Sequence, residues 1–207
     1  DPNTGEVQFK GRIVMMGYMK MPEETEAAID AQGWLHTGDQ AVIDADGFVK
    51  ITGRLKELIV TAGGENVSPV PIENKIMELC PLIANCVVVG DKRKFLSCLI
   101  SLKTEINPLT GEPTEALLPS VVAALKAQGG SATTLVEARN DPVVTKILEE
   151  AIEGYNKVAV SRAQEIRKWY LMERDLSLGH GELTATLKLK RSVVHQHYKK
   201  QIDSLYQ

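Results

Sequence analysis

The chain has 207 residues and a net charge of −3 at pH 7, and hydrophobic and charged residues make up 43% and 25% of it. This composition is ordinary for a globular protein, and the length allows one large domain or two small ones. The charge argues against general nucleic-acid binding, and no apolar run approaches the roughly 18 residues of a membrane-spanning helix.

The first 55 residues predict a β-rich segment. Apolar residues mark short strands in EVQFK and RIVMMGYM, which glycines punctuate. MPEETEAAID predicts a short helix, because Pro22 suits a first helical turn. AVIDADGFVKITG predicts a hairpin, because Asp46-Gly47 tolerates the positive φ of a tight turn. The chain begins without methionine and directly with strand-like alternation, so we expect a fragment of a longer protein.

A domain boundary is predicted near Lys56. After Arg54 comes the charged step LKE, followed by the apolar run LIV, which ends at TAGGEN. We therefore expect residues 1–55 and residues 56–207 to belong to different domains.

The next segment predicts one helix and two paired strands. Ser68 is expected to cap a helix that runs to about Leu79, where Pro81 stops it. Two strongly apolar strands, residues 83–90 and 95–102, flank the charged turn DKRK and are expected to pair antiparallel.

The remaining residues again mix helices with strands. Residues 103–140 are less regular, with a loop at NPLTGEP and a helix near 115–127. Asp141-Pro142 opens a long amphipathic helix, IRKWYLM predicts a third strand, and a final helix starts at about Ser192. The apolar stripe of the long helix is Val144, Ile147, Leu148, Ala151, Ile152, Tyr155 and Val158. Mixed helices and short strands predict an α+β fold.

Cysteine and histidine spacing gives no indication of a metal site. Three cysteines lie in or beside apolar runs without any Cys-x-x-Cys pair, so we expect reduced core thiols: Cys80, Cys86 and Cys98. Four histidines lack metal-ligand spacing, and we expect none to bind metal: His36, His180, His195 and His197.

Two segments in the first third of the chain offer candidate binding residues. In WLHTGD, Asp39 follows a glycine turn, where a carboxylate either caps the turn or accepts hydrogen bonds from a ribose diol. Arg54 is able to pair with a ribose or phosphate oxygen, or with a nearby carboxylate. Gly63 and Gly64 permit close approach of an extended ligand, although a Gly-Gly pair also suits a simple turn.

The segment HGELTATLKLKR carries a cluster of cations near the C-terminus. Lys188 and Lys190 share a face if this segment is extended, and Lys188 and Arg191 share one if it is helical. On a flexible arm, Lys188 either belongs to a solvated basic turn or is a mobile cation that stabilises phosphoryl charge in a transition state. No GxSxG motif supports nucleophilic catalysis.

These segments, taken in order, resemble the adenylate-forming superfamily of acyl-CoA synthetases, peptide-synthetase adenylation domains and luciferases. The series is GEVQFKGRIVMMGYM, GWLHTGD, GFVKITGRLKELIVTAGGENVSPVPIE and GELTATLKLKR, and it spans essentially the whole chain. GGENVSPVPIEN is similar to the long-chain fatty acyl-CoA synthetases. TGEPTE, NKVAVSRAQEI and GELTATLKLKR are similar to their bubblegum-type branch.

The resemblance implies a ligase that joins a fatty acid to ATP, with Mg²⁺, and then transfers the acyl group to coenzyme A. It implies that residues 1–55 end a large N-terminal domain and that residues 56–207 form a small lid domain with a short mixed or antiparallel sheet flanked by helices.

The roles it implies are also specific: ribose binding by Asp39, a nucleotide contact by Arg54, a hinge at Lys56, a pantetheine-side loop at Gly63 and Gly64, and a catalytic Lys188 that bridges carboxylate and α-phosphate.

Two departures and one absence qualify the resemblance. Ala185 stands where the branch usually has proline, and Leu187 where many superfamily members have glycine. The phosphate-binding loop and the adenine- and acyl-binding segments are missing, so we expect the fragment alone to be inactive. The alternatives are an adenylation domain for another carboxylic acid, or a non-catalytic binding module with the lid fold. The expected location is cytoplasmic, and peripheral contact with intracellular membranes stays open.

Overall fold

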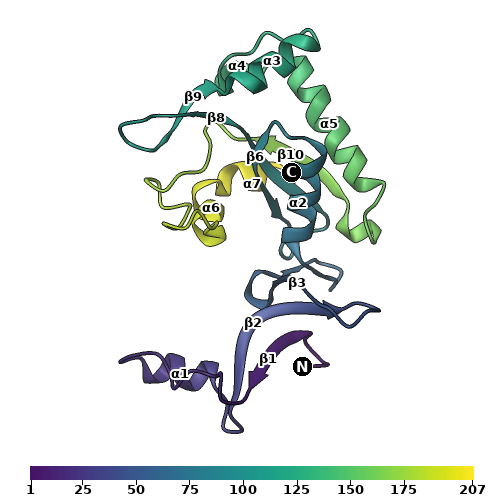
Figure 1. Ribbon diagram of the computed structural model, residues 1–207. Coiled ribbons are helices and arrows are strands. Elements are labelled where there is room, and N and C mark those ends of the chain that lie inside the picture. Colours follow the sequence, from purple (N-terminus) through teal and green to yellow (C-terminus); the bar gives the residue numbers. More distant parts are fainter. The chain divides into compact units, whose positions relative to one another are not determined.

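A computed structural model describes all 207 residues, and the chain divides into two compact units, Asp1–Leu58 and Ile59–Gln207 (Figure 1). None of its helices is long and apolar enough to span a bilayer. The fold is α+β, as predicted, with seven α-helices and four small sheets.

The first unit is built on a three-stranded antiparallel sheet in the order β1-β2-β3. The predicted hairpin is confirmed, because Gly47 at its turn has a φ of +87° and the strands on either side pair. The predicted short helix is also confirmed, with Pro22 in its first turn. The elements are β1 (Glu6–Lys10), α1 (Pro22–Ala28), β2 (Trp34–Ile43), β3 (Val49–Arg54) and the 3₁₀ turn η1 (Leu55–Glu57).

The strand expected in RIVMMGYM is wrong, because these residues form turns and bends. Gly11 and Gly17 have φ values of +129° and +149°, which lie outside the extended region. The Tyr18 amide donates to the hydroxyl of Thr25 on α1 instead of to a neighbouring strand. Apolar residues here therefore do not mark a strand.

The second unit is centred on a mixed sheet in the order β10-β7-β6. β6 and β7 pair antiparallel around the charged turn, as predicted, and the predicted third strand pairs parallel with β7. The strands are β6 (Ile83–Val89), β7 (Leu96–Leu102) and β10 (Ile166–Leu171), and a separate short hairpin consists of β4 (Ile59–Val60) and β5 (Asn66–Val67).

Helices cover both faces of this sheet, and its central strand β7 is buried at every position. Cys86 and Val88 point into one core with α2 and α5, while Val87 and Val89 alternate into a second core with α6 and α7. The helices are α2 (Pro69–Leu79), α5 (Pro142–Asn156), α6 (Arg191–His197) and α7 (Lys199–Ser204), with the 3₁₀ turn η2 (Arg162–Gln164) before β10. The three cysteines are buried and unpaired, as expected of core thiols.

Helix α2 has the predicted bounds, and α5 has the predicted start. The final helix begins one residue before the predicted start and is interrupted at Tyr198.

The helix expected near 115–127 begins later than predicted. Residues 113–117 form a strand instead, because Pro119 opens the helix and disfavours helical geometry in the residue before it. The elements of this region are β8 (Thr104–Ile106), β9 (Pro113–Leu117), α3 (Pro119–Ala127) and α4 (Leu135–Ala138).

Asp141 fastens the start of α5 to the loop before it. One carboxylate oxygen accepts from the Val143 amide at 2.8 Å, and the other accepts from the amides of Ser131 at 2.9 Å and Ala132 at 3.2 Å. The hydrogen bond from the Ser131 amide is the largest cause of a pKa for Asp141 below its ordinary value of 3.8.

We expect Asp141→Ala to lower the free energy of unfolding by about 1–2 kcal/mol, as for other lost helix caps, when measured by urea denaturation. Asp141→Asn, which keeps a neutral acceptor, should lose less. Because the folded-state pKa is depressed, the contribution of Asp141 is complete above pH 3.8 and disappears as the pH falls through the folded value. An unchanged urea midpoint in Asp141→Ala would contradict this role.

Candidate functional site

Asp39 and Arg54 lie opposite each other on neighbouring strands. They are register partners in the β2–β3 pair, and Arg54 Nε lies 3.2 Å from Asp39 Oδ1. Side-chain exposure is 34% for Asp39 and 62% for Arg54, so solvent and ligands reach both. The structure therefore brings these two predicted residues together.

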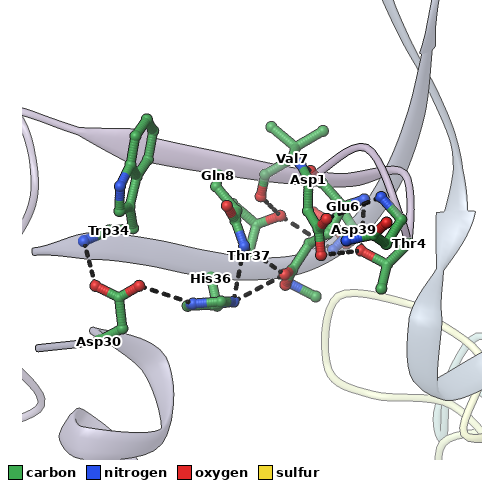
Figure 2. Close-up of polar contacts among 12 residues, drawn as sticks. Asp1, Thr4, Glu6, Val7, Gln8, Asp30, Trp34, His36, Thr37 and Asp39 are labelled. Atoms are coloured by element: carbon green, nitrogen blue, oxygen red, sulfur yellow. Dashed lines mark hydrogen bonds and ion pairs between the residues drawn. The ribbon is translucent and has the colours of Figure 1, made fainter. Parts of the chain in front are cut away.

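The backbone around Asp39 is held by a network that the sequence did not predict (Figure 2). The Thr37 hydroxyl donates to the Val7 carbonyl at 2.7 Å and accepts from the Asp39 amide at 3.0 Å. The Gly38 amide donates to Glu6 Oε1 at 2.8 Å, and Gly38 has a φ of +70°. Strand β1 thus fixes the irregular stretch of β2 that carries Asp39.

His36 lies between two carboxylates in the same network (Figure 2). Its Nδ1 is 2.8 Å from Glu6 Oε2, and its Nε2 is 3.5 Å from Asp30 Oδ2. The hydrogen bond with Glu6 is the largest cause of a raised pKa for His36. Glu6 and His36 are thirty residues apart in the chain, so no local sequence pattern indicates their contact.

Gly63 and Gly64 form the exposed turn between β4 and β5. The Gly64 amide donates to the Thr61 carbonyl at 2.9 Å, and Gly64 has a φ of +81°. The turn also pairs with the charged turn after β6, since the Ala62 amide donates to the Arg93 carbonyl at 2.9 Å. No atom outside its chain neighbours lies within 4 Å of where a Cβ of Gly64 would stand, so a ligand is able to approach the backbone.

Lys188 lies at an exposed turn between β10 and α6, in the second unit. Hydrogen bonds close this segment, for which the sequence suggests a flexible arm, into a turn. The Thr184 amide donates to the Lys188 carbonyl at 2.8 Å, and the Lys188 amide donates to the Thr184 hydroxyl at 3.0 Å. Leu187 has a φ of +57°, a conformation that glycine adopts without strain, and this explains why glycine suits that position in many superfamily members.

The other predicted residues occupy separate places. Lys56 is exposed in η1, within three residues of the division between the two compact units. His197 contacts the buried Glu182, and His180 contacts Ser177. The chain contains no group of three or more side chains arranged to hold a metal ion.

Sequence reasoning missed two ion pairs, each with a buried carboxylate, on either side of the Lys188 turn. Glu182 pairs with Arg174 at 2.6 Å, and Arg191 pairs with Glu73 at 2.6 Å. Arg191 was recognised only as part of a basic cluster. Its partner lies 118 residues away, and only the folded chain brings the two together.

Known proteins match nearly the whole chain. Residues 56–138 match the family described as the AMP-binding enzyme C-terminal domain. The chain is 50% identical over 204 residues to long-chain-fatty-acid–CoA ligase ACSBG2 of Gallus gallus, and 49% identical over 205 residues to ACSBG1 of Bos taurus. Each match covers 98% of this chain, which spans only 27% and 28% of those relatives.

Solved structures share the fold. The adenylation domain of the carboxylate reductase from Mycobacterium chelonae matches 98% of this chain, and 27% of its own, with a TM-score of 0.72 and 21% identity. The corresponding domain from Segniliparus rugosus, in complex with AMP and a co-purified carboxylic acid, matches 98% of this chain and 28% of its own, with a TM-score of 0.71. The chain belongs to the adenylate-forming superfamily, and within it to the bubblegum-type branch of the long-chain fatty acid–CoA ligases, of which it represents a part.

Proposed function

We propose that this chain is the lid-bearing part of an ATP-dependent long-chain fatty acid–CoA ligase. The observation that carries the proposal is the 50% identity to such a ligase over 98% of the chain. The chain spans 27% of that relative, so the activity belongs to a longer protein. Its substrates are then a fatty acid, ATP and coenzyme A.

We assign residues 1–55 to the end of a large N-terminal domain and residues 56–207 to the lid. The division between compact units after Leu58 and the family match that starts at residue 56 both support this assignment. Several large apolar side chains of the first unit are exposed, including Ile13 at 83%, Met16 at 102% and Phe48 at 71%. Such a surface is typical of one that packs against more protein. Lys56, exposed two residues before the end of the first unit, is the proposed hinge.

The Asp39–Arg54 pair is the proposed nucleotide contact. A carboxylate accepts hydrogen bonds from both hydroxyls of a ribose diol, and the arginine beside it orients the carboxylate. Mg²⁺ is expected with ATP, but these residues do not provide a ligand set for it. We therefore assign the ion to parts of the ligase outside this chain.

The lysine turn is the proposed catalytic element. In the first half-reaction a carboxylate oxygen of the fatty acid attacks the α-phosphorus of ATP, the bond to pyrophosphate breaks, and acyl-adenylate forms. The Lys188 ammonium then stabilises negative charge that builds up between the carboxylate and the α-phosphate. In the second half-reaction the sulfur of coenzyme A attacks the acyl carbon and AMP leaves. For that step the lid rotates, and the Gly63-Gly64 turn lies beside the pantetheine arm.

In the full-length ligase, Lys188→Ala is expected to slow adenylation by about 100-fold or more, the effect of losing one preorganised charge. Pyrophosphate release measures this step. Thioester formation from supplied acyl-adenylate should change far less. Lys190→Ala, which removes the exposed neighbouring lysine, is the control and should leave adenylation near its normal rate. Equal losses in both half-reactions of Lys188→Ala would mean that the residue is structural.

Asp39→Ala in the same ligase is expected to weaken ATP binding by about 10-fold or more, because two hydrogen bonds to a charged acceptor are lost. The KM for ATP in the adenylation assay reports it, while the KM for the fatty acid should stay constant. Asp46→Ala removes an exposed carboxylate from the hairpin turn of the same sheet and is the matched control. A ribose role for Asp39 is excluded if both variants behave alike.

The purified 207-residue chain should form no acyl-adenylate from ATP and a fatty acid, because the phosphate, adenine and acyl sites belong to the proposed large domain. Mass spectrometry of the reaction mixture detects the adenylate directly. Formation of acyl-adenylate by this chain alone would refute the assignment of these sites to the large domain.

A further inference from the structure

The loop that carries Lys188 begins at the buried residue Glu182 and ends at Lys190, which is hydrogen-bonded back to Glu182. The Lys190 amide donates to the Glu182 carbonyl at 2.7 Å, and Leu183 and Leu189 form an antiparallel bridge just inside that contact. Seven residues lie between Glu182 and Lys190, and Lys188 lies in the returning limb of this closed turn, opposite Thr184. The position of its backbone is therefore set by the position of Glu182.

The side chain of Glu182 is buried and has three hydrogen-bonding partners. It is 0% exposed, and Arg174 donates two hydrogen bonds to it, to Oε2 at 2.7 Å and to Oε1 at 2.6 Å. His197 Nδ1 lies 2.9 Å from Oε1, and the Ser177 amide donates to Oε2 at 3.2 Å. One carboxylate thus joins the segment after β10, the lysine turn and helix α6. A bidentate arginine pair also fixes the orientation of the carboxylate.

A second buried pair fixes the chain just beyond the turn. Arg191 donates to both oxygens of Glu73 on α2, at 2.6 Å each, and Glu73 also accepts from the Val88 amide at 2.7 Å. The turn therefore stands between two anchors in the second unit, whereas Lys188 itself is exposed. This arrangement suits a charged group that has to be presented to a ligand in a defined place.

We propose that Glu182 is a positioning residue for Lys188, so that its buried carboxylate determines where the lysine ammonium stands during adenylation. The inference rests on the proposed function, and it adds a residue that acts only through the lysine. Thioester formation does not use Lys188, so the loss of Glu182 should affect that step much less.

The variant that tests this is Glu182→Gln in the full-length ligase, because it keeps the shape of the side chain and removes the charge. A misplaced catalytic group typically costs about 10- to 100-fold in rate, so adenylation should fall by that factor while thioester formation from supplied acyl-adenylate stays within a few-fold. Asp175→Asn is the matched control. Asp175 lies on the same segment, and its carboxylate accepts from Asn85, Ser101 and the Leu176 amide, none of which belongs to the lysine turn.

A double-variant comparison separates a positioning role from a structural one. If Glu182 acts through the lysine, Glu182→Gln should have little further effect on adenylation when Lys188 is already alanine. Independent, multiplying losses in the double variant, or equal losses in both half-reactions, would overturn the proposal. If Glu182→Gln fails to fold by circular dichroism, Glu182→Asp, which keeps the charge and shortens the side chain, undergoes the same comparison with the same outcomes.

The two proposals fail in distinguishable ways. Normal adenylation in Lys188→Ala would refute the proposed function. Slow adenylation in Lys188→Ala together with normal adenylation in the folded Glu182 variant would refute only the positioning role.

Discussion

The buried carboxylate of Glu182 is the constraint on which the candidate catalytic element depends. Removing one partner of a buried ion pair leaves the other charge without compensation in a poorly solvated place. Burial would raise the pKa of Glu182, but the hydrogen bonds from Arg174, His197 and the Ser177 amide bring it below the ordinary value, so the group is ionised at neutral pH. The charge is kept in the interior because three segments of the lid converge on it.

The lid therefore combines a fixed turn with an exposed cation. The proposed two-step reaction needs Lys188 in the site for the first step and away from it for the second, and the sequence alone suggested that a loose arm provides the movement. The hydrogen bonds within the turn, together with the Glu182 and Arg191 anchors, favour a different source of the movement. Under the proposed function, the turn keeps its shape and the rotation of the whole lid about the proposed hinge moves the lysine. In the first unit, Glu6 and Thr37 hold the backbone beside Asp39 in a similar way.

Much of the fold could be predicted from local patterns. The Asp46-Gly47 hairpin, helix α2 and the β6–β7 pair each depend on residues close together in the chain, and all three are confirmed. The RIVMMGYM strand was wrong because its apolar side chains do not face a sheet of this chain. The supporting residues Glu6, Glu73 and Glu182 escaped prediction for another reason. Isolated acidic residues have no periodicity, and their partners are identified only by tertiary contacts; for Glu73 the partner is 118 residues away.

Amide hydrogen exchange at Lys190 tests the fixed turn most directly. Its amide donates to the Glu182 carbonyl, whereas Ala185 lies exposed at the tip of the same turn. If Glu182 clamps the turn, the Lys190 amide exchanges slowly, at a rate close to that of the β7 amides, and Glu182→Gln accelerates it. Exchange at Lys190 as fast as at Ala185 in the unaltered chain would contradict the account, because the lysine would then stand on a loose arm after all.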